Sequence, residues 1–136
     1  MSEGTQEGVF VFMDGSRYEG QYIQQDSGEM VRHGTGTFSC GADGIEQYQG
    51  SWKNDKMYGK GEFKFASGAI YKGSFVDNLF DGDGKYTWSD GATYTGSWKE
   101  SKMHGNGKYI DTEHVAWKGK FYNGKYFNGK TYIIVR

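Results

Sequence analysis

A repeat of 23 residues is the feature that most constrains how this chain can fold. Each copy opens with an aromatic residue, then glycine two positions later, then a second aromatic two positions after that. In three copies a Gly-x-Gly pair begins 11 residues after the opening aromatic. Self-similarity at such a period indicates stacked units that bury their apolar faces only against one another. The opening aromatics are Tyr48, Tyr71, Tyr94 and Trp117.

Residues 1–136 are predicted to form one array of unequal copies. A copy lengthened by insertions precedes the regular ones, and its insertion at residues 23–33 is compatible with an ordered or a mobile loop. The last copy lacks its Gly-x-Gly pair, as expected of a terminal repeat that caps an array. The units are a half repeat at 8–17, the lengthened repeat at 18–47, full repeats at 48–70, 71–93 and 94–116, and a degenerate repeat at 117–136.

Within each copy the side chains alternate with a period of two. From Tyr71 to Phe75 the aromatic and glycine positions share one face, whereas Lys72 and Ser74 share the other. This alternation is typical of a half-buried β-strand. Aromatic residues make up 18% of the chain and Leu79 is its single leucine, so a helical core is disfavoured. The sequence therefore predicts an all-β protein, a meander of about ten short antiparallel strands.

The alternation also predicts how the strands pair. If Tyr71 faces Tyr86, then Gly73 faces Gly84 and Phe75 faces Gly82. A glycine stripe would then cross the sheet beside an aromatic stripe, and neighbouring rings could lie flat on this glycine floor. The structural glycines are Gly50, Gly61, Gly73, Gly84, Gly96, Gly107 and Gly119. The aromatic stripe is Tyr71, Tyr86, Tyr94, Tyr109 and Trp117.

The aromatic face is the candidate binding surface. We expect most rings to be used in packing within the sheet, and a minority to remain accessible in a groove. Aromatic anchors in a concave site are typical hot spots for a partner protein, here a helical or extended segment. The candidate groove residues are Tyr48, Trp52, Tyr71, Phe75, Tyr86, Trp88, Tyr94, Trp98 and Tyr109.

Charge is distributed unevenly, although the net charge is only −1. Residues 1–50 hold eight acidic and two basic side chains, or −6, and residues 91–136 hold eight basic and three acidic ones, or +5. The alternative function is therefore peripheral binding to an anionic phospholipid membrane through the basic C-terminal half. Its candidate patch, which would equally suit an acidic partner, is Lys99, Lys102, Lys118, Lys120, Lys125 and Lys130.

Residues for catalysis or for a cofactor do not form a recognisable pattern. The three histidines lie far apart in the sequence, and Cys40 is the single cysteine, without a nearby base to activate it. No spacing typical of a metal site is seen, and no helix is expected after a Gly-x-Gly pair to bind a nucleotide. We expect a protein that is not an enzyme, binds no cofactor, metal or nucleic acid, and resides in a reducing, cytoplasmic compartment.

The motifs quoted above resemble the MORN (membrane occupation and recognition nexus) repeat. The resemblance covers residues 8 to about 124, and His33-Gly34 and His104-Gly105 match its His-Gly pair. Residues 67–121 are most similar to short animal members of the family. The resemblance implies an elongated, twisted, single-layer antiparallel sheet with a groove. It also implies scaffold or adaptor work in the cytoplasm, within cytoskeletal, ciliary or sperm, or vesicle-associated assemblies.

Two departures from the repeat lie near the C-terminus. His114 stands where a turn glycine is expected, which predicts a remodelled turn at that point. The final stretch, TYIIVR, strongly favours a strand, and an unprotected edge of this kind invites a partner strand. Self-association through this C-terminal edge is therefore a further expectation.

Overall fold

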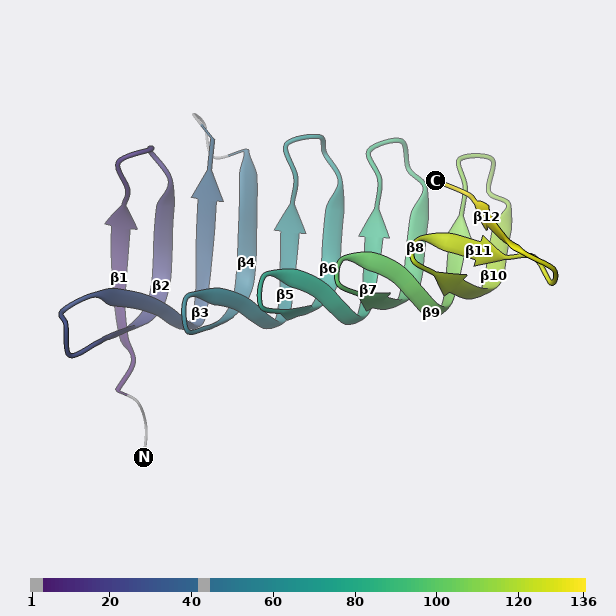
Figure 1. The fold of residues 1–136 in the computed structure, drawn as a ribbon. Helices are drawn as coiled ribbons and strands as arrows, with labels where there is room; N and C mark the ends of the chain where they lie inside the picture. The colour runs from purple at the N-terminus through teal and green to yellow at the C-terminus, as the bar shows by residue number, and fades with distance from the viewer. Residues whose placement is uncertain (1–3, 42–44) are drawn as a thin grey trace.

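The fold is seen in a computed structural model that describes residues 4–41 and 45–136. These residues form one open antiparallel sheet in which every strand pairs only with its neighbours in the sequence (Figure 1). The predicted meander is confirmed, with two further strands from the degenerate last repeat. The strands are β1 (Gln6–Val11), β2 (Arg17–Gln24), β3 (Met30–Cys40), β4 (Glu46–Lys53), β5 (Lys56–Lys64), β6 (Ile70–Val76), β7 (Leu79–Thr87), β8 (Thr93–Lys99), β9 (Lys102–Ile110), β10 (Ala116–Tyr122), β11 (Lys125–Phe127) and β12 (Tyr132–Ile134).

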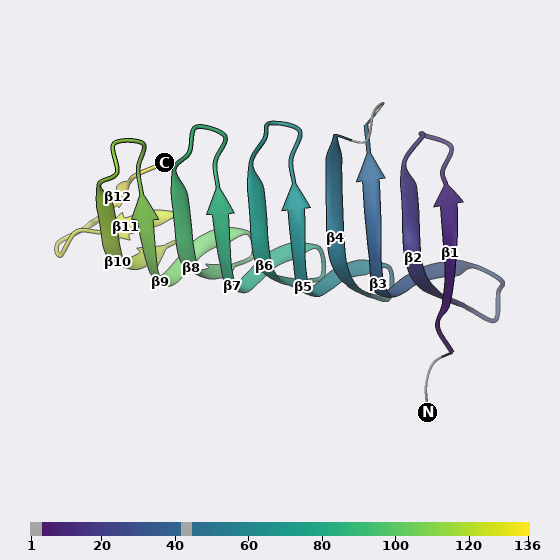
Figure 2. The same cartoon turned by 180° about the vertical axis from the view of Figure 1, so that it is seen from behind.

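The sheet is folded into a trough. Its strands stand side by side, and one end of each hairpin swings sharply out of the plane, toward the viewer in Figure 1 and away in Figure 2. Pairing shifts by two residues beyond four equivalent glycines, Gly20, Gly50, Gly73 and Gly96. Such bulges bend a strand and increase its twist.

The pairing of glycines and aromatics agrees with the sequence-based register. Gly73 faces Gly84 and Tyr71 faces Tyr86, and the same pairing recurs along the array. The prediction that Phe75 faces Gly82 is wrong, because the bulge after Gly73 intervenes. Phe75 faces Phe80 instead. The glycine stripe spans β1 to β10 and includes three positions beyond those predicted: Gly8, Gly20 and Gly36.

Hairpins at one edge of the sheet use a loop of three residues. In the loop at 89–91, the Trp88 amide donates to the Ala92 carbonyl over 2.9 Å, and Gly91 is left-handed with φ +96°. The loop at 112–114 keeps this geometry with His114 at φ 67°. Asp111, the residue before the loop, accepts the Val115 backbone N–H through its carboxylate Oδ1 at 2.9 Å. The predicted remodelling of this turn is therefore wrong: histidine adopts the conformation that glycine adopts elsewhere.

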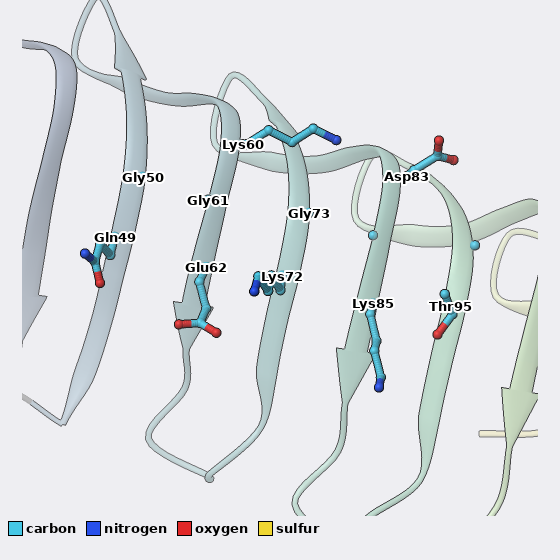
Figure 3. Close-up of a pocket in the computed structure, with 12 residues that line it drawn as sticks. Gln49, Gly50, Lys60, Gly61, Glu62, Lys72, Gly73, Asp83, Lys85 and Thr95 are labelled. Atoms are coloured by element: carbon cyan, nitrogen blue, oxygen red, sulfur yellow. The ribbon is translucent and has the colours of Figure 1, made fainter.

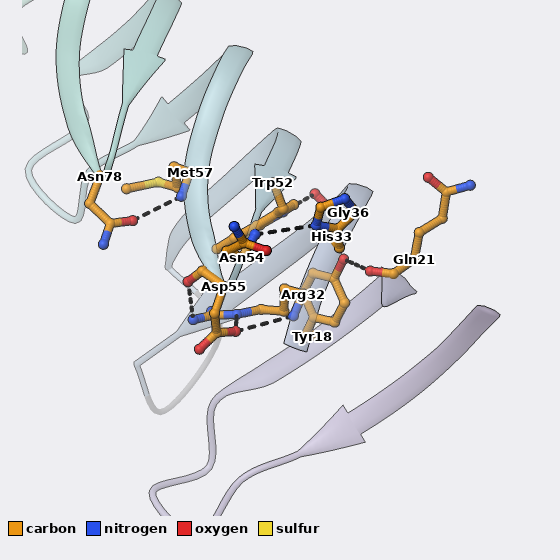
Figure 4. A network of polar contacts seen from close by, with 10 residues as sticks. All are labelled: Tyr18, Gln21, Arg32, His33, Gly36, Trp52, Asn54, Asp55, Met57 and Asn78. Atoms are coloured by element: carbon orange, nitrogen blue, oxygen red, sulfur yellow. Dashed lines mark hydrogen bonds and ion pairs between the residues drawn. The ribbon is translucent and has the colours of Figure 1, made fainter. Parts of the chain in front are cut away.

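Four hairpins at the bent edge use two-residue turns with both residues left-handed, a type that favours Asn, Asp and Gly. The turn pairs are Asn54–Asp55, Asp77–Asn78, Glu100–Ser101 and Asn123–Gly124. Three of these turns are tied to the preceding repeat by a reciprocal pair of hydrogen bonds, which we call the inter-repeat clamp. In one clamp the Asn78 amide donates to the Met57 carbonyl over 3.0 Å, and the Met57 amide donates to Asn78 Oδ1 over 2.9 Å (Figure 4).

The first clamp carries an ion pair as well. The Asp55 amide donates to the Arg32 carbonyl, and the Arg32 amide donates to Asp55 Oδ1. The Arg32 guanidinium also donates to Asp55 Oδ1, through Nε at 2.7 Å (Figure 4). The guanidinium lies 4.3 Å from the Trp52 ring centroid. In the third clamp, the Ser101 amide donates to the Phe80 carbonyl, and the Phe80 amide donates to the Ser101 hydroxyl oxygen. The clamps therefore couple each repeat to the next beyond the ladder of the sheet.

A ladder of eight aromatic rings forms the core on one face of the sheet. Successive rings meet edge to face, with centroids 4.8–5.5 Å apart and planes at 80–89°. Each such contact contributes about 0.5–1.5 kcal/mol beyond the area that it buries. A single layer can thus be stable without helices to cover it. In order, the ladder is Tyr18, Trp52, Tyr48, Phe75, Tyr71, Trp98, Tyr94 and Phe121.

The glycine stripe makes room for the ladder, as the floor hypothesis predicts. A Cβ added at Gly84 would lie 2.5 Å from Cζ and 2.6 Å from Cε1 of Tyr71. The same ring reaches across the stripe to donate its hydroxyl to the Ser74 carbonyl at 2.8 Å. Burial raises the pKa of the equivalent Tyr48 and Tyr94 to about 12. These rings are therefore uncharged structural members of the sheet.

The C-terminal segment folds back over the same face. β11 and β12 lie on the side toward which the bent hairpin ends project, and both views agree (Figures 1 and 2). The chain ends with the Arg136 guanidinium 4.5 Å from the Trp88 ring centroid, and its Nη1 lies 2.8 Å from Asp90 Oδ2. Val135 packs against the aromatic core. This segment covers part of the face that the sequence predicts to be a groove.

Candidate functional site

The predicted aromatic groove is mostly core. Seven of its nine residues are buried, and two are half-buried, Tyr86 and Trp88. The buried seven stabilise the sheet and are not open to a partner in this conformation: Tyr48, Trp52, Tyr71, Phe75, Tyr94, Trp98 and Tyr109. Contact with a partner remains a prediction for the accessible pair.

Tyr86 and Trp88 lie at a cavity that the C-terminal segment closes. Their ring centroids are 4.7 Å apart. The cavity has a volume of about 470 Å³, and it is lined by these two rings together with Phe80, Ile134 and Arg136, among others. Cation–π contact and an ion pair hold the terminal arginine in place. A ligand at Trp88 would therefore compete with the chain's own end.

A longer groove runs along the glycine stripe on the opposite, polar face. Three adjoining hollows make it up. The largest, of about 760 Å³, lies over Gly50 to Gly96 (Figure 3). A second, of about 490 Å³, shares Gly50 with it and continues to β1 and β2. A third, of about 350 Å³, shares Gly96 and continues to β10. Because the floor is glycine backbone, a ligand could approach the main chain closely.

The walls of this polar-face groove are charged side chains from positions next to the glycines. Glu7 and Glu19 line its end at β1 and β2. Lys60, Glu62 and Asp83 are among the mixed charges at its centre. Towards β10 the wall is basic, with lysines on β6, β7, β9 and β10. These are Lys72, Lys85, Lys108 and Lys118. The charge asymmetry of the sequence thus becomes a polarity along one groove.

The six lysines of the predicted basic patch are all exposed but come from three places. Lys118 and Lys120 are on the polar face of β10. Lys99 and Lys102 face each other across the Glu100–Ser101 turn. The other two belong to the C-terminal hairpin: Lys125 and Lys130. Of the six, Lys118 is the one that lines the polar-face groove.

The described residues offer surfaces for binding and no metal cluster. Residues 4–41 and 45–136 hold no group of three His, Cys, Asp or Glu side chains that could bind a metal ion. Burial, and then the Glu46 carboxylate 3.7 Å from its sulfur, raise the pKa of the Cys40 thiol, which favours the protonated, less nucleophilic form. His33 accepts a backbone hydrogen bond from Asn54 through Nδ1 at 3.2 Å, a structural role at a turn.

Within the same described part of the chain, no helix is long and apolar enough to span a bilayer.

Comparison with known families agrees with this geometry. Residues 48–70, 71–93 and 94–113 match the family model of the MORN repeat. Residues 48–113 are thus a run of MORN repeats. The first two matched segments coincide with the full repeats at 48–70 and 71–93, and the third covers residues 94–113 of the repeat at 94–116. Each segment begins one or two residues inside a strand, in β4, β6 and β8. MORN repeats generally serve as protein- or membrane-binding modules. No curated protein matches the chain.

Several features of the site were absent from the sequence-based prediction. The polar-face groove depends on the glycine stripe, which was predicted, but of its charged wall only Lys118 was among the predicted site residues. The inter-repeat clamps had a readable signal in the Asn-Asp and Asp-Asn pairs, which favour two-residue hairpin turns. The contact of the Arg136 guanidinium with the Trp88 ring had no signal in the sequence, because 48 positions separate the two residues.

Proposed function

We propose that this protein is a non-catalytic adaptor that binds a segment of a partner protein in the polar-face groove. The observation that carries the proposal is the continuity of the groove over β1 to β10. At about 4.8 Å per strand, the groove is about 43 Å long. That length could hold about 29 residues of a helix at 1.5 Å per residue.

The accessible aromatic pair is a second contact for the same partner or for another. Tyr86 and Trp88 supply the type of side chain that dominates protein interfaces. Because Arg136 lies on Trp88, this contact would need the C-terminal segment to shift. The groove needs no such movement, and we therefore regard it as the primary site.

The cellular setting is proposed from resemblance alone. Residues 67–121 resemble the short animal MORN repeat-containing protein 2, and this likeness favours cytoskeletal, ciliary or sperm, or vesicle-associated assemblies in the cytoplasm. In such assemblies an adaptor would hold two components together. The open β12 edge, which ends in a strand-forming sequence, would allow self-association.

Blocking the groove tests the proposal. Thr95 is exposed on the groove wall, so Thr95→Trp would fill the groove without altering charge. Thr112→Trp, in an exposed loop outside the groove, is the matched control. Proteins captured from native cells by the wild type and the control should be lost with Thr95→Trp. Recombinant fragments of those proteins should then bind the wild type and not the variant. Identical capture by all three folded chains would refute the groove as the site.

A membrane-binding function is the second candidate, supported by the exposure of all six predicted lysines. Each lysine near an anionic surface contributes about 1 kcal/mol. Sedimentation with vesicles of phosphatidylcholine alone, or with added phosphatidylserine, tests it. Binding only to the anionic vesicles, weakened by Lys118→Glu and Lys120→Glu, is the result expected. Binding that does not depend on lipid charge would reject this candidate.

A further inference from the structure

Four lysines of the polar-face groove form a row across neighbouring strands. Lys72 faces Lys85 directly across β6 and β7, and Lys108 faces Lys118 across β9 and β10. Thr95 on β8 joins the two pairs, because it faces both Lys85 and Lys108. All four lysines are exposed. We call them the lysine row.

The lysine row is unfavourable for the sheet by itself. Like charges placed directly opposite one another destabilise a strand pair. Among residues 4–41 and 45–136, the ion pairs found do not include any lysine of the row. Lys72 also faces Glu62 across β5 and β6, which offsets the repulsion at that end of the row. Across the described strands, the other three lysines of the row face no acidic residue. A bound anionic side chain would relieve the repulsion that the fold leaves in place.

The far end of the groove has the opposite charge. Glu7 and Glu19 line the groove at β1 and β2. Arg17 lies 3.1 Å from Glu19, but both side chains are largely exposed, so this pairing is weak. The groove therefore has an acidic end and a basic end, joined by an uninterrupted glycine floor. A ligand that carries both signs of charge would have one preferred direction in it.

Spacing favours a helix over an extended strand as the occupant. The lysine row advances by about 4.8 Å per strand, close to the rise of about 5.4 Å per helical turn. Acidic residues three or four apart on a helix would therefore meet Lys72 and Lys85 and, after one further turn over Thr95, Lys108 and Lys118. Alternate side chains of an extended chain lie about 6.6 Å apart and would fall out of step. A helix also has a partial positive charge at its N-terminus and a negative one at its C-terminus, which matches the groove.

We propose that the groove binds a partner helix whose C-terminal half carries an acidic stripe, with that half over the lysine row and its N-terminal half over Glu7 and Glu19. The acidic stripe would cover β6 to β10, about 19 Å or about 13 helical residues. This inference rests on the proposed adaptor function and adds the chemistry and direction of the partner.

Designed peptides test it with the full-length protein. One labelled 28-residue helical peptide carries Glu at every third or fourth position of its C-terminal half and Lys at the same spacing in its N-terminal half. The second peptide has the reversed sequence, and so the same composition. Fluorescence anisotropy should show the first binding at least fivefold more tightly. A photo-crosslinker at the acidic end should label β9 or β10, and one at the basic end should label β1 or β2.

Charge reversal identifies the surface. Lys72→Glu with Lys108→Glu should weaken binding of the first peptide at least tenfold. Lys64→Glu with Lys130→Glu, which changes the net charge equally at exposed positions outside the groove, should change it less than twofold. Equal affinity for both peptides, or equal loss in both variants, would overturn the inference.

Two further results separate this inference from its alternatives. If neither peptide binds but the Lys72/Lys108 variant loses binding to phosphatidylserine vesicles, the row is a membrane contact and the helix proposal is wrong. If both peptides fail while Thr95→Trp still abolishes capture of a native partner, the adaptor function holds and only the acidic-helix inference fails.

Discussion

Replacing Gly84 by alanine should destabilise the sheet far more than a single methyl group usually does. The new Cβ would sit 2.5 Å from Cζ of Tyr71 and closer still to its hydroxyl. Tyr71 is fully buried and stacks on Phe80 at 3.9 Å, so its ring has no free space to enter. Overpacking of a core costs about 1–3 kcal/mol. Loss of the hydroxyl's hydrogen bond to Ser74 leaves a buried polar group unpaired, at about 1–3 kcal/mol more.

The expected loss in the free energy of unfolding is therefore about 2–6 kcal/mol. Urea unfolding followed by far-ultraviolet circular dichroism would measure it. Gly8→Ala is the matched control on the same stripe: its Cβ would meet only ring edges, of Phe10 at 3.1 Å and Tyr22 at 3.2 Å, which line the open edge of the sheet. We expect the control to cost less than about 1 kcal/mol. A Gly84→Ala loss below 1 kcal/mol, or an equal loss at Gly8, would refute the role of the glycine floor.

Three other perturbations follow from the turns, the C-terminal segment and the buried tyrosines. Glu100→Asn should raise the free energy of unfolding by about 0.5–1 kcal/mol in urea titrations, because asparagine tolerates the left-handed turn better; a destabilised variant would contradict this. Arg136→Ala should cost about 0.5–1 kcal/mol and increase acrylamide quenching of Trp88, and unchanged quenching would show that the arginine does not cover the ring. The raised pKa values of Tyr48 and Tyr94, about 12, mean that stability is full below pH 10 and is lost as pH rises through 12. Absorbance at 295 nm should then show a late tyrosinate step that coincides with unfolding, whereas a single step near pH 10 in a folded chain would disprove it.

The fold was readable from the sequence because its information is local and repeated. A period of two along each strand decides which side chains share a face, and Gly91 marks a tight turn. Together they determine that Gly84 pairs with Gly96 and Tyr86 with Tyr94, as found. The error at Phe75 has a different origin. A bulge changes the count of backbone residues between two strands, and the alternation of side chains continues unchanged through it.

The candidate site was less predictable, because exposure depends on three-dimensional curvature. The sequence shows that Trp98 is apolar and on the aromatic face. It does not show that a trough brings this indole into edge-to-face contact with Tyr71 and Tyr94, where its Nε1 donates to the Gly84 carbonyl at 3.1 Å. Likewise, the lysines of the groove read as ordinary solvent-facing positions until the register places Lys72 opposite Lys85.

Pairing of every strand with its sequence neighbours has a consequence for how the chain acquires its fold. Contacts that are near in sequence close short loops, so their formation carries a small entropic cost and is fast. A hairpin leaving the ribosome would find its partner strands already made, and no later segment would be needed to complete an earlier ladder. Because the aromatic ladder also advances one repeat at a time, growth can proceed from either end. Evolution could therefore lengthen such an array by whole units of 23 residues without redesigning any contact already present.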